Sequence, residues 1–307
     1  MIRGLSVLPH IRVEIMRANA LEPLILAADS ESIEVQREVA AALANLAMAE
    51  ENKSSIAERG GLPALVKLAR SRDRERERYS TAAIANVAEM LDGRAHSLLI
   101  NEGALDAVLS LVETPLEEVK REVARTLALF ASREDSHQAL MRAGGHERLM
   151  GFLRSKDTLC ARFAALGVGN LALVPAAHAH ILHRPAMAAL VSLADADDVE
   201  TRRCVAFALN NLATNEANHG LLERVGVAKP LISLAARFDD TDTHLQAVIG
   251  LRHLALHPKC RVDIVAMGGL APLLELASMS GAPPEVGREV TCALRNVSLS
   301  ESGKVAL

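Results

Sequence analysis

The chain has 307 residues, half of them hydrophobic, and its 34 Lys and Arg against 38 Asp and Glu give a formal net charge of −4. This balance argues against nucleic acid or an anionic membrane as a general partner, and no apolar run approaches the length of a membrane span. With no Trp, one Tyr and five Phe, the interior is expected to consist of Leu, Ala and Val, which suit close helix stacking.

The first complete pattern along the chain starts with a long helix predicted over Ile33 to Ala47, where apolar residues recur at intervals of three and four. A short helix is predicted over Asn52 to Arg59, a corner at Gly60 and Gly61, and a second short helix over Leu62 to Ala69. A polar loop then leads to the next long helix. We call the two short helices the first and second helices of a unit. The long helix is its third helix. Since no stretch shows sustained strand alternation, we predict an all-α fold.

The end of the third helix recurs seven times. The copies read AALANLA (41–47), AAIANVA (82–88), RTLALFA (125–131), LGVGNLA (166–172), FALNNLA (207–213), IGLRHLA (249–255) and CALRNVS (292–298). The steps of 41 to 43 residues fit a helical solenoid. We therefore predict third helices that end near residues 47, 88, 131, 172, 213, 255 and 298, in a single continuous array over residues 1–307.

Three further columns repeat with the same period. The corner column reads Asn19, Gly60, Gly103, Gly144, Pro185, Gly226 and Gly268. Five residues after each corner lie Leu24, Leu65, Val108, Leu149, Leu190, Leu231 and Leu273. A third column, near the end of each third helix, contains Leu46, Val87, Phe130, Leu171, Leu212, Leu254 and Val297. These last two columns are the predicted core.

Both ends of the sequence interrupt a unit. Residues 4–19 match residues 253–268, so the chain starts near the end of a third helix, and it stops just after another third helix. Solenoids need terminal repeats with a polar outer face, and neither end supplies one. We expect the chain to be a segment truncated at both ends from a longer protein.

The sequence offers no convincing catalytic, cofactor or metal site. The GxGxxA pattern that starts at Gly167 lies inside a predicted helix and follows no strand, so it is not a dinucleotide site. His178, His180 and His183 align with an ordinary corner between units and have no Cys, Asp or Glu at ligand spacing. No nucleophile, base and orienting residue form a recognisable set. We predict no catalytic residue, no cofactor and no metal.

The four cysteines lie in separate units and never form a CxxC pair. They are Cys160, Cys204, Cys260 and Cys292. We interpret them as small buried hydrophobes of a reducing compartment rather than as a disulfide or metal set. This predicts a cytoplasmic or nuclear protein.

The phrases EVQREVAAALANLAMAEENKSSIAERGGLPALVKLA and VGVAKPLISLAARFDDTDTHLQAVIGLRHLA resemble the armadillo repeat, of the beta-catenin and vacuolar armadillo adaptor type. The resemblance covers essentially the entire chain. It implies an armadillo-repeat right-handed superhelical solenoid of about seven repeats, in which the third helices line a concave groove. It also implies that a repeated Asn on these helices clamps the main chain of an extended peptide.

Five copies keep that asparagine. They are Asn45, Asn86, Asn170, Asn211 and Asn296, whereas Leu129 and His253 break the column. One carboxamide offers a donor and an acceptor, so it can hold a peptide unit at two points. The alternative is that the asparagines tether neighbouring helices and bind nothing. If they clamp a partner, changing Asn170 and Asn211 together to Ala should weaken binding while the melting temperature stays nearly intact.

The side chains on the same helical face as the asparagines set the expected specificity. Four and seven residues before them, Phe163, Leu166, Phe207 and Ile249 make the middle and later groove apolar, as in grooves that seat hydrophobic anchors. The alternative is that these residues pack between repeats. The resemblance would place Trp there in nuclear-import adaptors, and this chain has none, which disfavours an importin-alpha-like mechanism.

An arginine column lies eight residues before the asparagines. Its members are Arg37, Arg78, Arg121, Arg162, Arg203 and Arg288. In five of seven copies a Glu precedes the Arg by three residues, and such local ion pairs explain the column without a ligand. Arg162 lacks this acid, so we expect Arg162, with Arg252 and Arg295 beside the asparagine column, to be free for a partner.

The function predicted from the sequence is a non-enzymatic scaffold or adaptor that binds an extended or helical segment of another protein in the groove. The alternative is the targeting or regulatory region of a larger multidomain protein, such as a ubiquitin ligase. Vacuolar adaptors of this family attach through a lipid on a glycine after the initiator, but Ile2 follows Met1 here. A vacuolar or other organelle membrane could then be reached only through other parts of the parent chain. We predict neither nucleic acid binding nor direct membrane insertion.

Overall fold

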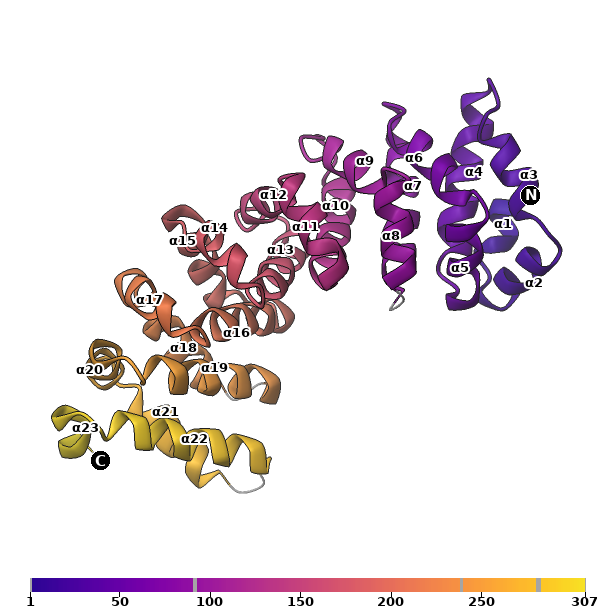
Figure 1. The fold of residues 1–307 in the computed structure, drawn as a ribbon. Coiled ribbons are helices and arrows are strands. Elements are labelled where there is room, and N and C mark those ends of the chain that lie inside the picture. Colours follow the sequence, from indigo (N-terminus) through magenta and orange to yellow (C-terminus); the bar gives the residue numbers. More distant parts are fainter. Residues whose placement is uncertain (1, 91–92, 238–239, 280–282, 307) are drawn as a thin grey trace. The chain divides into compact units, whose positions relative to one another are not determined.

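The computed structural model describes residues 2–90, 93–237, 240–279 and 283–306. Over these ranges every regular element is an α-helix or a short 3-10 helix (Figure 1), which confirms the predicted all-α fold. The chain forms two compact units, residues 1–149 and 150–307. The prediction of a single continuous array concerns how these units join, and it stays a prediction.

The first unit repeats short, short and long helices. In chain order they are α1 (Ile2–Ser6), η1 (Pro9–Ile11), α2 (Arg12–Arg17), α3 (Leu21–Ala27), α4 (Ile33–Leu46), α5 (Glu50–Glu58), α6 (Gly61–Ala69), α7 (Arg74–Ala88), α8 (Gly93–Asn101), α9 (Ala104–Ser110), α10 (Glu117–Ala131), α11 (Glu134–Arg142) and the start of α12 (Gly145–Phe152). The third helices are α4, α7 and α10, and α7 packs against both of the others (Figure 1).

The second unit continues the same order. In chain order its helices are α13 (Thr158–Leu171), η2 (Pro175–Ala177), α14 (His178–Ile181), α15 (Arg184–Ser192), η3 (Leu193–Asp195), α16 (Val199–Ala213), η4 (Glu216–Asn218), α17 (His219–Val225), α18 (Ala228–Ala235), α19 (Thr241–Leu254), α20 (Pro258–Ala266), α21 (Leu270–Ser278), α22 (Pro284–Val297) and α23 (Glu301–Ala306). Here α13 packs against α16, α16 against α19, and α19 against α22. All seven third helices end within one residue of the predicted positions.

Most third helices start at a side chain that caps them. Each such residue accepts a hydrogen bond from the backbone N–H three positions further on; these caps are Ser32, Asp73, Asp157, Asp198 and Asp240. A cap of this kind satisfies one of the free N–H groups of a helix start and typically adds about 1 kcal/mol. At these five third helices the polar loop therefore contains the signal for where the helix begins.

The corner column has a backbone reason. Asn19 and the five corner glycines adopt positive φ, between 59° and 87°, a conformation that costs glycine little. Pro185 cannot adopt it because its ring fixes φ near −65°. In that repeat the extended residue His183 precedes α15 and Pro185 occupies the first turn of that helix.

The two predicted core columns are confirmed. Every member of the column one residue after the asparagines is at most 1% exposed, and every member of the column after the corners is at most 6% exposed. Burying one such side chain typically contributes about 1.5–3 kcal/mol. The asparagine-bearing face of each third helix is thus fixed by the burial of the adjacent positions.

Within the described residues no single helix is long and apolar enough to cross a membrane. The helices Thr158–Leu171 and Pro175–Ile181 reach that composition only when they are taken together across a bend of 120°.

Candidate functional site

Four of the five column asparagines tether neighbouring helices. Their Nδ2 atoms donate to main-chain carbonyls 42 to 44 residues earlier in the sequence: Asn86 to Ala44 O at 3.3 Å, Asn211 to Gly169 O at 3.0 Å, Asn296 to Arg252 O at 3.1 Å, and Asn45 to Arg3 O at 3.5 Å. Asn45 Nδ2 also donates to Ser6 Oγ at 3.1 Å. The accepting residue directly precedes the asparagine column of the preceding repeat. The tethering alternative therefore holds for these amide nitrogens.

At Asn86 the chain also occupies the amide oxygen. Arg125 Nη2 donates to Asn86 Oδ1 at 3.0 Å, and the same guanidinium pairs with Glu89 and, at 3.1 Å, with Glu122. Burial would raise the pKa of Glu89, but Arg125 and Lys53 together hold it below its usual value. Both ends of this carboxamide therefore already make a hydrogen bond inside the first unit, which leaves Asn86 less suited to clamp a partner.

The two breaks in the asparagine column differ from each other. Leu129 is a half-buried apolar residue. His253 Nε2 accepts a hydrogen bond from Arg252 at 2.9 Å. Burial and then the Arg252 charge lower the pKa of His253 to about 4, so the ring is neutral near pH 7. Neither residue offers the paired donor and acceptor of a carboxamide in this arrangement.

A cavity of about 550 Å³ lies between the third helices α13, α16 and α19. Five predicted groove residues line it: Arg162, Phe163, Leu166, Asn170 and Phe207. Five lining residues were not predicted: Glu200, Arg203, Cys204, Asp242 and Gln246. Burial raises the pKa of the Cys204 thiol to about 11, which makes it a poor nucleophile. The structure thus brings together the middle of the predicted groove.

The other predicted groove residues lie outside this cavity. Ile249 is half-buried on α19, and Asn211 and Asn296 are buried at their tethers. Asn45 and Asn86 belong to the first unit. Arg295 is exposed on α22.

Phe207 reaches the cavity because Gly169 has no side chain. A Cβ atom at Gly169 would lie 2.6 Å from Phe207 Cδ1, which is closer than two carbon atoms can approach. The ring therefore packs against α13 and still remains half-exposed toward the cavity. The glycine in the GxGxxA pattern has a packing role, as expected for a residue inside a helix.

The expectation that Arg162 lacks an acidic partner is wrong. Its Nε and Nη2 atoms donate to the two carboxylate oxygens of Asp198 at 2.9 and 2.6 Å. Asp198 lies 36 residues later, where it caps α16, so reasoning about neighbours on one helix could not find it. Arg203 pairs in the same way with Asp240, the cap of α19, at 3.1 and 2.6 Å. These two members of the arginine column therefore join consecutive repeats.

Arg252 is also paired, contrary to expectation. Its Nε atom lies 2.7 Å from Glu289 Oε2, a carboxylate supplied by the next third helix, α22. Burial of most of the Glu289 side chain keeps this ion pair largely away from solvent. Among the three predicted free arginines, Arg295 alone has no acidic partner within the described residues, and its role stays a prediction.

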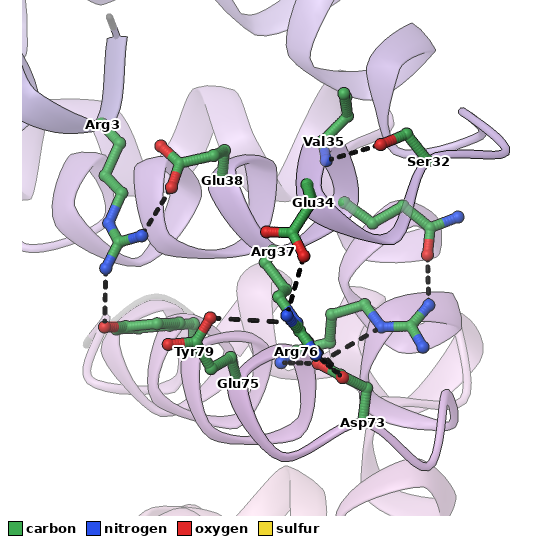
Figure 2. A network of polar contacts seen from close by, with 11 residues as sticks. Arg3, Ser32, Glu34, Val35, Arg37, Glu38, Asp73, Glu75, Arg76 and Tyr79 are labelled. Carbon is green, nitrogen blue, oxygen red and sulfur yellow. Dashed lines mark hydrogen bonds and ion pairs between the residues drawn. The ribbon is translucent and has the colours of Figure 1, made fainter.

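Figure 2 shows the equivalent bridge in the first unit. Arg37 donates to both oxygens of Asp73, the nearest contact being 2.7 Å, and also pairs with Glu34 at 3.0 Å. Asp73 in turn caps α7 through the backbone N–H of Arg76. The predicted local pairs therefore form at Arg37 and Arg203, but Arg78 lies nearest to Glu118 of the next repeat, at 3.7 Å.

Asp73 should make stability depend on pH. The hydrogen bond from Arg37 is the main cause that lowers its pKa from 3.8 to about 2, while burial opposes it and the Arg76 N–H adds to it. Because the folded pKa lies below the unfolded one, this contribution is present above about pH 4 and is lost as the pH falls toward about 2. We expect the stability deficit of Asp73→Asn to shrink over that window in urea unfolding at graded pH.

Asp106→Asn is the matched control, because Asp106 is an exposed carboxylate in α9. Its difference from the wild type should stay close to zero at every pH. A deficit of Asp73→Asn that is the same at about pH 7 and about pH 2 would contradict the bridge.

The side chain of His178 hydrogen-bonds at the C-terminal end of a helix instead of joining a histidine cluster. Its Nε2 atom contacts Ala172 O, just beyond the end of α13, at 2.8 Å, and its Nδ1 atom contacts Asn218 Nδ2 at 2.9 Å. With the carbonyl as acceptor, Nε2 carries the proton and Nδ1 accepts. His183, by contrast, is exposed.

Comparisons with known proteins agree with the repeat pattern. The family model for the Armadillo/beta-catenin-like repeat matches residues 9–48. Importin subunit alpha-2 of Oryza sativa subsp. japonica is 24% identical over 243 residues, which cover 75% of this chain and 46% of that protein. Vacuolar protein 8 of Schizosaccharomyces pombe is 28% identical over 230 residues, covering 72% and 38%. The chain spans less than half the length of these curated relatives.

Solved structures give the same result. An engineered protein from the Northeast Structural Genomics Consortium is 29% identical with a TM-score of 0.89, covering 97% of this chain and 73% of that one. A designed armadillo repeat protein, solved in complex with peptide (KR)4, is 23% identical with a TM-score of 0.69, covering 77% and 99%. Repeated units of short, short and long helices whose third helices pack on one another define an α-solenoid protein. The chain is similar in sequence and in fold to armadillo-repeat proteins.

Proposed function

We propose that this chain is a non-enzymatic scaffold that binds segments of other proteins along the third helices of residues 150–307. The observation that carries the proposal is the 550 Å³ cavity between α13, α16 and α19, which gathers Phe163, Leu166 and Phe207 beside Asn170. Cavities of this size with an apolar floor and a few polar groups are typical binding sites.

A similar solved structure supports the proposal that the chain binds segments of other proteins. The designed armadillo repeat protein was solved with a bound peptide, which shows that an armadillo array of the same fold can hold a peptide. The first unit is less suited to main-chain clamping, because Arg125 and Ala44 already occupy the carboxamide of Asn86. We therefore place the main partner site in the second unit.

Leu166→Glu tests the proposal. A carboxylate introduced into the cavity floor could be buried only at a cost of several kcal/mol, so proteins that bind there should be recovered at least about tenfold less in a quantitative pull-down. Leu173→Glu is the matched control, because Leu173 is 62% exposed and lies outside the cavity. It should recover the same proteins as the wild type.

A second variant guards against misfolding of Leu166→Glu. Cys204→Trp fills the cavity with a ring, and Cys204 makes no polar side-chain contact in the described part of the chain. Circular dichroism should show native helicity for any variant that is used. Recovery of an unchanged set of proteins by folded Leu166→Glu and Cys204→Trp would refute binding at this cavity.

A further inference from the structure

The charges around the cavity are unbalanced. Two guanidinium groups, Arg162 and Arg203, lie near four carboxylates, Asp198, Asp240, Glu200 and Asp242. The formal charge of this group is therefore −2. Arg162, Arg203, Glu200 and Asp242 line the cavity itself and balance one another, so the excess comes from Asp198 and Asp240 behind the lining. Such an excess near a cavity favours a cationic partner over an anionic one.

Both arginines are already engaged. Arg162 holds Asp198 through two donors, and Arg203 holds Asp240 through two donors and Glu200 through a third. A carboxylate or phosphate of a partner would have to displace one of these charge-assisted bonds, which are the strong class of hydrogen bond. The arginine column therefore does not recruit an acidic partner at this cavity.

The carboxylates are the accessible charges. The side chains of Glu200 and Asp242 are 49% and 69% exposed, whereas those of Asp198 and Asp240 are 24% and 11% exposed. Glu200 and Asp242 also line the cavity itself, from the first turns of α16 and α19. A cation that enters the cavity edge meets these two groups first.

The floor of the same cavity is apolar. Phe163, Leu166 and Phe207 are each half-buried and contribute to its lining. A volume of about 550 Å³ falls within the range of small-ligand pockets, so a bulky aliphatic or aromatic side chain fits. An occupant that matches this cavity therefore places an apolar group against the floor and a basic group near Glu200 and Asp242.

We propose that the partner is a protein segment with a bulky apolar side chain seated on Phe163, Leu166 and Phe207, and with a Lys or Arg one or two positions away that pairs with Glu200 and Asp242. This inference rests on the proposed function.

Selection of peptides tests the inference. A phage library of random peptides of about 12 residues is selected on the immobilised chain, and bound phage are eluted and sequenced. We expect a bulky apolar residue with Lys or Arg one or two positions away to be enriched. The best peptide, synthesised with a fluorophore, is then titrated by anisotropy against wild type and Glu200→Gln/Asp242→Asn.

The charge variant should weaken binding of this peptide about 3- to 10-fold, since partly exposed ion pairs contribute modestly. Replacing the basic residue of the peptide with Gln should cost the same on the wild type and nothing further on the variant. The control Glu216→Gln/Glu275→Gln removes the same charge at exposed residues outside the cavity and should leave affinity within about twofold.

The outcomes separate the two proposals. Selected peptides that lose binding to Leu166→Glu but are acidic, or are indifferent to Glu200→Gln/Asp242→Asn, overturn the basic partner and leave the cavity as the binding site. Peptides that bind Leu166→Glu as well as the wild type, or a selection that yields no cavity-dependent peptide, count against both.

Discussion

Asp240→Ala is expected to destabilise the second unit by about 2–3 kcal/mol. The carboxylate caps α19 through the N–H of Thr243 and holds Arg203 of α16 through two hydrogen bonds, so its loss removes a cap and leaves a guanidinium without its main partner. The same hydrogen bond from Arg203 is the first cause of the lowered pKa of Asp240. Urea unfolding followed by circular dichroism measures the change.

Asp242→Ala is the natural control. It lies two residues away and is 69% exposed, with its nearest contact to Arg203 at 3.6 Å, so it should cost no more than about 0.5 kcal/mol. Equal effects of the two substitutions would mean that local charge, rather than the bridge between repeats, supplies the stabilisation.

Asn86→Ala is expected to cost about 2 kcal/mol. The substitution removes one hydrogen bond to Ala44 O and one from the Arg125 guanidinium, at a position that is only 9% exposed. Asn101→Ala, which changes an exposed asparagine at the end of α8, should be nearly neutral. Differential scanning calorimetry or urea unfolding of the two variants decides the matter, and a neutral Asn86→Ala would show that the tether stabilises nothing.

This expectation changes how the asparagines should be tested. The sequence suggested that Asn170 and Asn211 could be changed to Ala with the melting temperature nearly intact. Asn211 is 6% exposed and donates to Gly169 O at 3.0 Å, so its removal should lower stability as well as any binding. Changes to the apolar floor, such as Leu166→Glu, separate binding from folding more cleanly.

The fold could be predicted because every repeat contains the same pattern of residues. Two apolar columns and a corner column recur with one period, and the buried fraction of their members and the positive φ of the corners follow directly from residue type. The departure at the fifth corner, Pro185, could also be predicted, since proline excludes the conformation of the others. Because the pattern repeats, signals that are weak in a single unit together predict the ends of the third helices to within one residue.

The site was predicted only in part, because its polar partners lie in different repeats. Phe163, Leu166 and Phe207 share one helical face with the asparagines, so their shared cavity followed from periodicity. Arg162 was misjudged because its partner is 36 residues away at a helix cap. A search for an acid three residues away on the same helix could not detect that relation, although an Asp before the next third helix was visible in the sequence.

Each bridge between repeats takes its arginine from one repeat and its carboxylate from the next. Where Leu245 replaces the arginine of its column, the residue before the next third helix is Pro283 instead of Asp, so both halves of the bridge are missing together. In such a bridge one carboxylate caps the start of its own helix and also pairs with the arginine of the preceding repeat. A repeat transplanted into another array would need an Arg in its new predecessor, or it would contribute an unmatched charge at the junction.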